Sequence, residues 1–182
     1  MENEAFLVPL KDFDIAKVRL RNAGVGDASS IAKSLAQRVV RELAKRQVWI
    51  ITESSDVRDF AEREGCASFT SPATSLNEAV SAAYKEIGQH FERLIIVHGD
   101  IRHPDGLASH SWLDGITVVT DRHGTGTNVL SLPTGLDFGF AYGEGSAQLH
   151  GAEARRLGQE THFVEQSPWG LDIDTPEDLL EA

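Results

Sequence analysis

The segment Leu94-Ile-Ile-Val97-His-Gly-Asp100 decides the fold class of this chain. Four consecutive apolar residues predict a strand that is buried on both faces, as in the centre of a parallel sheet, because a strand with one solvated face would alternate polar and apolar residues. The strand delivers Asp100 to its carboxyl end, where open α/β sheets bind ligands. We therefore expect Asp100 to lie in a functional site.

On both sides of this segment, strand patterns alternate with helix patterns. Short apolar runs predict strands at 5–10, 48–51, 116–119 and 128–132, and a last strand–helix junction at 171–176. Apolar residues three or four positions apart predict amphipathic helices that begin at Asp27, at Asp56, at a Ser75/Glu78 capping box and at about residue 147. Thr175 and Pro176 fit the N-cap and first position of a final helix.

This alternation predicts an α/β fold, a three-layer sandwich with a mostly parallel sheet, in one domain spanning residues 1–182. A chain of this length buries about 70% of its unfolded surface, which is enough for a core without disulfides or structural metals. Hydrophobic residues make up 41% and charged residues 25% of the chain, as is typical of globular proteins.

The net charge of −11 disfavours non-specific binding to nucleic acid or to an anionic membrane, because both are held mainly by Lys and Arg. Residues 1–4 are acidic where a signal peptide is basic, and no apolar run approaches the roughly 20 residues of a membrane span. The single cysteine, Cys66, is expected to be a half-buried structural thiol and not a nucleophile. We therefore expect a cytoplasmic protein without nucleic-acid or membrane partners.

Three aspartates are candidate metal ligands. Asp172 and Asp174 flank Ile173, and side chains two residues apart on an extended segment point to the same side. With Asp100 they can present hard oxygen donors, which magnesium prefers, to one region. Alternatively, Asp172 or Asp174 only caps the last helix and Asp100 only ends a strand. Clustering at strand ends in an already acidic protein favours the magnesium site.

Two glycine-rich segments are candidate anion-binding loops. Residues 121–128 can fold tightly and point N–H and hydroxyl groups at an anion, although a tight turn between strands explains the same pattern. Residues 142–147 lead into a predicted helix whose N-terminus could hold a phosphate or carboxylate near Ser146. A plain helix cap is the alternative there.

Other catalytic motifs do not occur. The histidines lack the spacing of a zinc site, and a Gly-x-Ser-x-Gly nucleophile turn is absent, so we expect no covalent catalysis. Neither Gly-x-Gly-x-x-Gly nor Gly-x-x-x-x-Gly-Lys-Ser/Thr follows the first predicted strand. Dinucleotide oxidoreductases and P-loop proteins therefore have no motif in this chain.

Several strings occur together and in order: Leu7-Val-Pro-Leu-Lys11, Ala16-Lys-Val-Arg-Leu20, Leu76-Asn77, Asp121-Arg-His-Gly-Thr-Gly-Thr-Asn128, Gly143-Glu-Gly-Ser146 and Leu171-Asp-Ile-Asp-Thr-Pro-Glu-Asp-Leu179. In this combination the chain resembles the 2-phospho-L-lactate guanylyltransferase family. That family includes the phosphoenolpyruvate and 3-phosphoglycerate guanylyltransferases of coenzyme F420 (deazaflavin) biosynthesis. The strings 121–128 and 171–176 are specific, whereas the N-terminal lysines and Leu76-Asn77 are supportive.

The resemblance implies a nucleotide-diphospho-sugar-transferase-like (Rossmann-like) fold and transfer of GMP from GTP to a small phosphorylated acid, with release of pyrophosphate. It also implies two Mg²⁺ ions, and a downstream transferase that receives the product and attaches it to the deazaflavin precursor. The site roles that it implies are metal binding and catalysis for Asp100, Asp172 and Asp174, acid binding for Thr127, Gly143 and Ser146, triphosphate binding for Lys11, Lys17 and Arg19, and a place near the guanine for Asn77.

The chain departs from the family pattern in three places. Residues 98–104, His-Gly-Asp-Ile-Arg-His-Pro, stand where Pro-Ala-Asp-Leu-Pro is expected, Ser75 replaces a glycine and Thr120 replaces a proline. These changes leave open which acid is the acceptor. The strictness for GTP and the oligomeric state also stay open. Two alternatives also stay open: a molybdopterin or sugar-phosphate nucleotidyltransferase of the same fold, and a catalytically silent nucleotide-binding protein.

Overall fold

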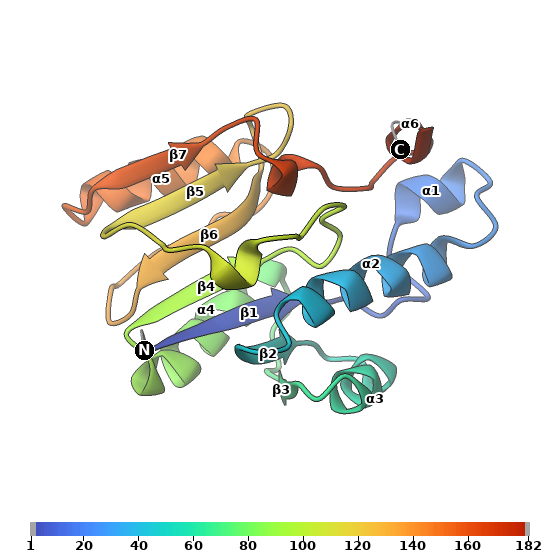
Figure 1. Ribbon diagram of the computed structural model, residues 1–182, viewed down its shortest axis with the longest axis horizontal. Coiled ribbons are helices and arrows are strands. Elements are labelled where there is room, and N and C mark those ends of the chain that lie inside the picture. The colour runs from blue at the N-terminus through green and yellow to red at the C-terminus, as the bar shows by residue number, and fades with distance from the viewer. Residues whose placement is uncertain (1–2, 181–182) are drawn as a thin grey trace.

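A seven-stranded sheet forms the centre of the computed structural model, which describes residues 3–180 (Figure 1). Residues 1 and 2 of the acidic N-terminal segment lie outside the described part. The strands are β1 (Glu4–Pro9), β2 (Gln47–Ile51), β3 (Ala67–Phe69), β4 (Arg93–Val97), β5 (Ile116–Thr120), β6 (Thr127–Pro133) and β7 (Thr161–Val164). The α-helices are α1 (Val18–Asn22), α2 (Ala28–Glu42), α3 (Ser55–Arg63), α4 (Leu76–Ile87), α5 (Ser146–Arg156) and α6 (Pro176–Leu180).

The strands lie in the order β3-β2-β1-β4-β6-β5-β7. β4 is the central strand, paired in parallel with β1 and antiparallel with β6. Since β5 is also antiparallel to β6 and parallel to β7, only β6 runs against the others in this sheet. The prediction of a mostly parallel sheet around residues 94–97 is therefore confirmed, and those four residues are fully buried.

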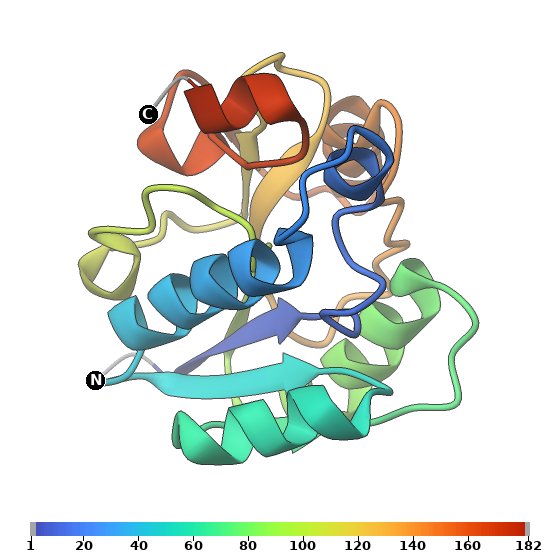
Figure 2. The same ribbon diagram turned by 90° about the vertical axis from the view of Figure 1, so that its right-hand side faces the viewer.

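Helices cover both faces of the sheet. Phe6 and Val8 of β1 pack in one hydrophobic cluster with residues of α2 and α3, whereas Ala5 and Leu7 pack in another with residues of α4 and α5. Figure 2 shows α2 and α4 on opposite sides of β1. Each fully buried large apolar side chain contributes about 1.5–3 kcal/mol. The three-layer arrangement expected from the sequence is confirmed.

The helix starts differ in detail from the predictions. Helix α3 is capped by Ser54, whose hydroxyl accepts from the N–H of Val57 at 3.4 Å, so the prediction that Asp56 opens this helix was wrong by one residue. Asp27 stands at the N-cap of α2 but makes no side-chain capping bond. The Ser75/Glu78 capping box is confirmed: Ser75 caps the N–H of Glu78, and Glu78 accepts from Thr74.

Three short elements were not predicted, namely α1, β3 and β7, and the predicted last strand is not part of the sheet. In the segment 171–175, only Asp172 forms a bridge, and it pairs antiparallel with Ile101 in the loop after β4. The alternation of apolar and polar residues correctly predicted extended backbone in this segment, but the segment pairs with a loop and not with a strand of the sheet.

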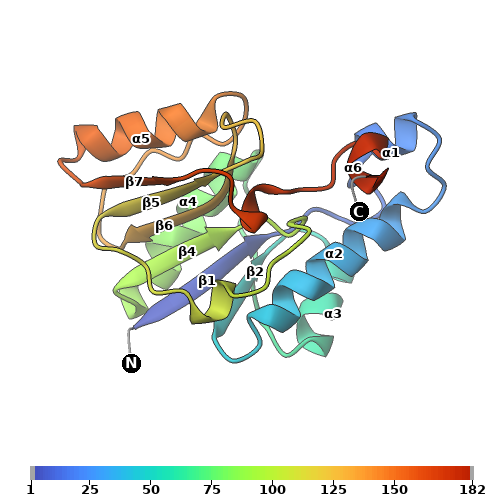
Figure 3. The ribbon, with the colours of Figure 1, turned by 45° about the horizontal axis from the view of Figure 1, so that its top comes forward.

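Helices α1 and α6 lie side by side beyond the carboxyl ends of β1 and β2 (Figure 3). Between them and α2 a small hydrophobic cluster is formed by Leu20, Ala28, Leu35 and Ile173. Within residues 3–180, no helix combines the length and the apolar character needed to cross a membrane. Cys66 is half-buried, as expected, and burial raises the pKa of its thiol.

Candidate active site

Two segments far apart in sequence meet at the carboxyl end of β4. The N–H of Arg102 donates to the carbonyl of Leu171 at 2.7 Å, and the N–H of Ile173 donates to the carbonyl of Asp100 at 3.3 Å. Because Ile173 is buried in the small cluster under α1, the side chains on either side of it point away from that cluster. This pairing brings Asp172 and Asp174 to Asp100.

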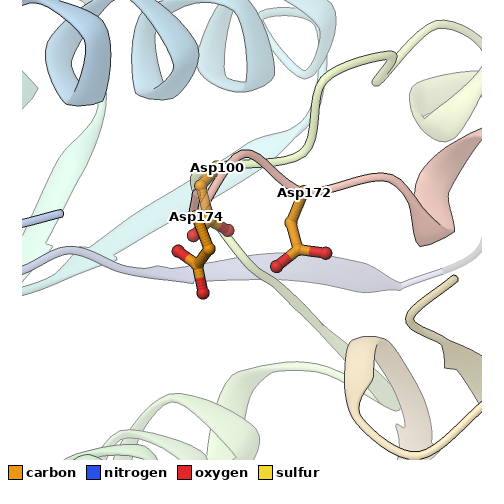
Figure 4. A group of neighbouring side chains, drawn as sticks. All are labelled: Asp100, Asp172 and Asp174. Atoms are coloured by element: carbon orange, nitrogen blue, oxygen red, sulfur yellow. The ribbon is translucent and has the colours of Figure 1, made fainter. Parts of the chain in front are cut away.

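Figure 4 shows the three carboxylates converging. One oxygen from each of Asp100, Asp172 and Asp174 lies within 4.8 Å of the others, and no other such group of His, Cys, Asp or Glu occurs in residues 3–180. We call these three residues the acidic cluster. Carboxylate oxygens are the ligands that magnesium takes from proteins, so the donor set fits that ion. The juxtaposition agrees with the sequence analysis, and the metal-binding role stays a prediction.

A lysine already supplies positive charge to the acidic cluster. The Nζ of Lys17 lies 2.5 Å from Oδ2 of Asp100 and 2.9 Å from Oδ1 of Asp174, and only 6% of its side chain is exposed. Its backbone is left-handed, with φ 55° and ψ 47°, a conformation that costs of order 1–3 kcal/mol for a residue with a side chain. The ammonium lies where the carboxylates need a cation.

The charges of the cluster shift one another's pKa values. Burial acts to raise the pKa of Asp100, but the positive charge of Lys17, with a smaller effect of His98, outweighs it and lowers that pKa. Burial, reinforced by the charges of Asp100 and Asp174, raises the pKa of Asp172. Burial alone would lower the pKa of Lys17, but the two aspartates raise it. Of the three carboxylates, Asp172 is therefore the one whose ionised form is stabilised most when a further cation approaches.

The other predicted triphosphate-binding residues lie near the cluster or in the loop leading to it. Arg19 on α1 has its Nη1 3.6 Å from Oδ2 of Asp174, and its side chain is 74% exposed. Such an exposed pair contributes little to stability and leaves the guanidinium accessible to a ligand. Lys11 is exposed in the loop that follows β1.

Asp178 holds the cluster segment in place, a role that was not predicted from the sequence. Its carboxylate accepts from the N–H groups of Asp174 at 2.7 Å and Thr175 at 2.6 Å, and it forms an ion pair with Arg122. Arg102 donates to its carbonyl at 2.7 Å. The string Thr175-Pro-Glu-Asp178 has the Ser/Thr-x-x-Asp/Glu spacing that marks a capped helix start, so a signal was present.

The loop 121–126 is shaped by its own hydrogen bonds. The Asp121 carboxylate accepts from the N–H groups of His123 at 3.1 Å and Thr125 at 2.9 Å, and its carbonyl accepts from Gly124 at 3.0 Å. A Cβ on Gly126 would lie 2.6 Å from the same carboxylate. The N–H groups of Gly124 and Thr125 are thus used within the loop, and anion binding by this loop stays a prediction.

The second glycine loop and the helix start that follows it contain two of the three predicted acid-binding residues, Gly143 and Ser146. Gly143 and Gly145 have φ of 132° and 71°, which favour glycine, and Gly145 is the N-cap of α5. Ser146 is the first residue of α5 and is buried. Thr127, at the start of β6, is also buried, and its hydroxyl lies 3.0 Å from Nδ1 of His150.

Asn77 holds this loop through both of its amide atoms. Its Nδ2 donates to the carbonyl of Tyr142 at 3.2 Å, and its Oδ1 accepts from the N–H of Tyr142 at 2.7 Å. An open groove of about 510 Å³ lies beside Asn77, between α4 and residues 138–140, and none of the three carboxylates lines it. The structure thus shows that Asn77 holds the backbone of Tyr142, and its predicted place near the guanine stays a prediction.

Two buried polar atoms belong to residues that neighbour the acidic cluster and the second glycine loop in sequence. His98 precedes Asp100 by two residues, and Tyr142 precedes Gly143 by one. The centroids of their rings are 5.2 Å apart. Within the described residues, His98 Nε2 and the Tyr142 hydroxyl have no hydrogen-bond partner. Buried polar groups are usually satisfied, so this region is suited to contact a polar ligand.

The architecture occurs in solved nucleotidyltransferases. A protein from Desulfovibrio desulfuricans described as a nucleotide-diphospho-sugar transferase is similar with a TM-score of 0.74 and 17% identity, covering 98% of this chain and 85% of that one. A nucleotidyl transferase from Methanothermobacter has a TM-score of 0.68 and 12% identity, covering 100% and 96%. At these identities the likeness establishes the fold, which is the nucleotide-diphospho-sugar-transferase-like fold expected.

Sequence comparison decides the family, because the family model described as "Guanylyl transferase CofC like" matches residues 4–182. The chain belongs to this family. Among its relatives, the phosphoenolpyruvate guanylyltransferase of Sphaerobacter thermophilus is 30% identical, covering 96% of this chain and 90% of the relative. The 2-phospho-L-lactate guanylyltransferase of Methanothermobacter thermautotrophicus is 28% identical, covering 96% and 82%.

In this CofC-like chain, the strings that carried the resemblance lie at the acidic cluster or against the second glycine loop and its neighbour His150. Residues 171–179 supply two carboxylates and Asp178, and residues 121–128 supply Arg122 and Thr127. Lys17 comes from the N-terminal string and Asn77 from the start of α4. The resemblance to this guanylyltransferase family, drawn from the sequence, is confirmed.

Proposed function

We propose that this protein transfers GMP from GTP to a small phosphorylated acid, with release of pyrophosphate, in the cytoplasm. The observation that carries the proposal is the acidic cluster, in which Lys17 already provides a positive charge, in a member of a guanylyl transferase family. The names of the relatives indicate phosphoenolpyruvate and 2-phospho-L-lactate as the acceptors to examine first.

Magnesium held by Asp100, Asp172 and Asp174, as one or two ions, would neutralise negative charge on the triphosphate and on the acceptor. Lys17 would turn from the carboxylates to phosphate oxygens, a short movement for a flexible side chain. Arg19 and Lys11 would contact the triphosphate from the solvent side. The protein's part is thus to place and neutralise the two phosphates.

The acceptor acid would lie between the acidic cluster and the second glycine loop. Thr127, Gly143 and Ser146 would bind it, and the unpartnered atoms of His98 and Tyr142 border the same region. An acceptor phosphate is already ionised at neutral pH, so no general base is required. The product, a guanylylated acid, would then pass to a downstream transferase that attaches it to the deazaflavin precursor.

The test is pyrophosphate release from GTP or ATP with magnesium and a panel of phosphorylated acids. We expect turnover with GTP and with phosphoenolpyruvate or 2-phospho-L-lactate. Equal turnover with ATP would overturn the assignment of GTP as the nucleotide. A lack of turnover with every acid would overturn the proposed transferase function. Glu177→Gln, at an exposed carboxylate near the cluster, serves as the control for charge changes that leave the cluster intact.

A further inference from the structure

His150 links the two parts of the predicted acid-binding region. It lies on α5, is fully buried, and uses both ring nitrogens. Nδ1 is 3.0 Å from the Thr127 hydroxyl on β6, and Nε2 is 3.0 Å from the backbone nitrogen of Ala141, two residues before Gly143. One imidazole therefore contacts both the strand and the loop.

The backbone contact determines which ring nitrogen carries the hydrogen. A backbone N–H can only donate, so Nε2 of His150 accepts from Ala141 and must be unprotonated. A neutral imidazole then carries its hydrogen on Nδ1, which donates to the Thr127 oxygen. Burial lowers the pKa of His150 to about 4, so the ring stays neutral near neutral pH.

The direction of the Thr127 hydroxyl follows. Because its oxygen accepts from His150, its own hydrogen must point elsewhere, and the described residues offer it no second hydrogen bond. A buried donor without an acceptor is unfavourable, so a ligand oxygen at this position would be stabilised by it.

We propose that His150 is a positioning residue that fixes the Thr127 hydroxyl as a hydrogen-bond donor to an anionic oxygen of the acceptor acid. The inference rests on the proposed function, because it takes Thr127 to be part of the acid-binding region. Without the contact to Ala141, His150 could take the other tautomer and accept a hydrogen bond from the Thr127 hydroxyl. The affinity of that hydroxyl for an anion would then be lower. The same ring anchors Ala141, so strand and loop are held in one register.

Two variants separate the two contacts of the ring. The Asn amide in His150→Asn reaches as far as Nδ1 and can still donate to Thr127, whereas the Gln amide in His150→Gln reaches as far as Nε2 and can only replace the contact with Ala141. We expect His150→Gln to raise the KM for the acid about tenfold or more with an unchanged KM for GTP. His150→Asn should keep the KM for the acid near the wild-type value. Equal increases in both variants would overturn the proposal.

Two further measurements distinguish this inference from the proposed function. In a Thr127→Val background, His150→Gln should raise the KM for the acid no further, and an additive increase would overturn the proposal. Imidazole nitrogen NMR of the wild-type protein should place the hydrogen of His150 on Nδ1, and a hydrogen on Nε2 would overturn it. The NMR result does not depend on turnover. A protein that is inactive with every acid would contradict the proposed function, and the NMR spectrum would still test the direction of the hydrogen bond between His150 and Thr127.

Discussion

Lys17 is the residue on which the acidic cluster depends when no metal ion competes for its oxygens. Replacing it in Lys17→Met keeps the length of the side chain and removes the charge, so Asp100 and Asp174 lose their partner. We expect the unfolding free energy without magnesium to fall by about 1–3 kcal/mol. The rise in Tm on adding magnesium should be larger than in the wild type, because the ammonium no longer competes.

Thermal denaturation with and without magnesium measures both effects. Lys11→Met, which removes an exposed lysine from the loop after β1, is the matched control and should leave both values unchanged. A magnesium-induced rise in Tm that is the same in Lys17→Met and the wild type would contradict the competition.

Asp174→Asn tests the metal-binding role directly. The amide nearly preserves the shape and removes the charge, so we expect kcat at saturating magnesium to fall by about two orders of magnitude or more. From the sequence alone, relief of repulsion among the carboxylates predicts an unchanged or slightly higher stability. The contacts with Lys17 and Arg19 instead predict a small loss, since Asp174 is also a partner of both. A variant with wild-type kcat would remove the metal-site proposal.

His150 should make the stability depend on pH. Its pKa falls from the usual 6.5 to about 4 because of burial, so the folded state binds its proton less readily than the unfolded state does. Its contribution is complete above about pH 6.5 and is lost as the pH falls toward 4, at up to about 1.4 kcal/mol per pH unit. In His150→Asn this part of the dependence should vanish. Urea denaturation of both proteins across that range measures it, and parallel curves would contradict the assignment.

At the residue scale, the sequence revealed the charged groups better than it revealed their partners. Asp172 and Asp174 flank an apolar residue in an extended segment, and Asp100 closely follows an apolar strand, so the local pattern predicts where these carboxylates lie. The roles of His150 and Arg122 depend on contacts across 23 and 56 positions, which no local pattern encodes.

At the scale of elements, the start of α6 is tied to the turn after β5. Asp178 is buried, pairs with Arg122, and holds the backbone of Asp174 and Thr175. Asp178→Ala would leave the guanidinium with one partner fewer and free two N–H groups, so we expect a loss of about 2–4 kcal/mol. Because Asp174 would no longer be fixed, magnesium should also bind more weakly.

The neighbouring Glu177→Ala removes an exposed carboxylate from the same helix and is the matched control. Calorimetric titration of magnesium into both variants, together with their melting curves, separates the two effects. Wild-type magnesium affinity in a folded Asp178→Ala protein would mean that Asp174 is held by other contacts.

The sequence predicted long apolar elements well and short ones poorly. β4, β6 and α2 have buried runs or a buried face, and their patterns are clear. β3 has three residues and β7 has four, and none of these is buried, so neither strand produces a recognisable pattern. For the segment 171–175 the pattern gave the direction of the side chains, but its partner is fixed by backbone hydrogen bonds that side-chain identity does not reveal.

At the scale of the whole molecule, the sheet and the acidic cluster are built from different parts of the chain. All seven strands lie before residue 165, whereas two of the three carboxylates follow residue 170. A chain ending after Gly170 should therefore keep the sheet and melt cooperatively at a lower temperature, because Ile173 is lost from the small cluster under α1.

Circular dichroism and magnesium titration check this expectation. The truncated chain should show no rise in Tm with magnesium, since Asp100 alone remains of the cluster. A full magnesium-induced rise would place the metal elsewhere. A truncated chain without cooperative melting would show instead that the sheet requires the C-terminal segment.

The pairing of residues 100–102 with 171–173 also has a consequence for how the protein is made. A ribosome releases the chain from its N-terminus onward, at about 5–20 residues per second, and domains fold as their segments emerge. Lys17 and Asp100 leave the ribosome well before Asp172 and Asp174 do. A growing chain can thus assemble most of its sheet while it still lacks two of its three carboxylates, and the acidic cluster would be complete only after residues 171–174 have emerged.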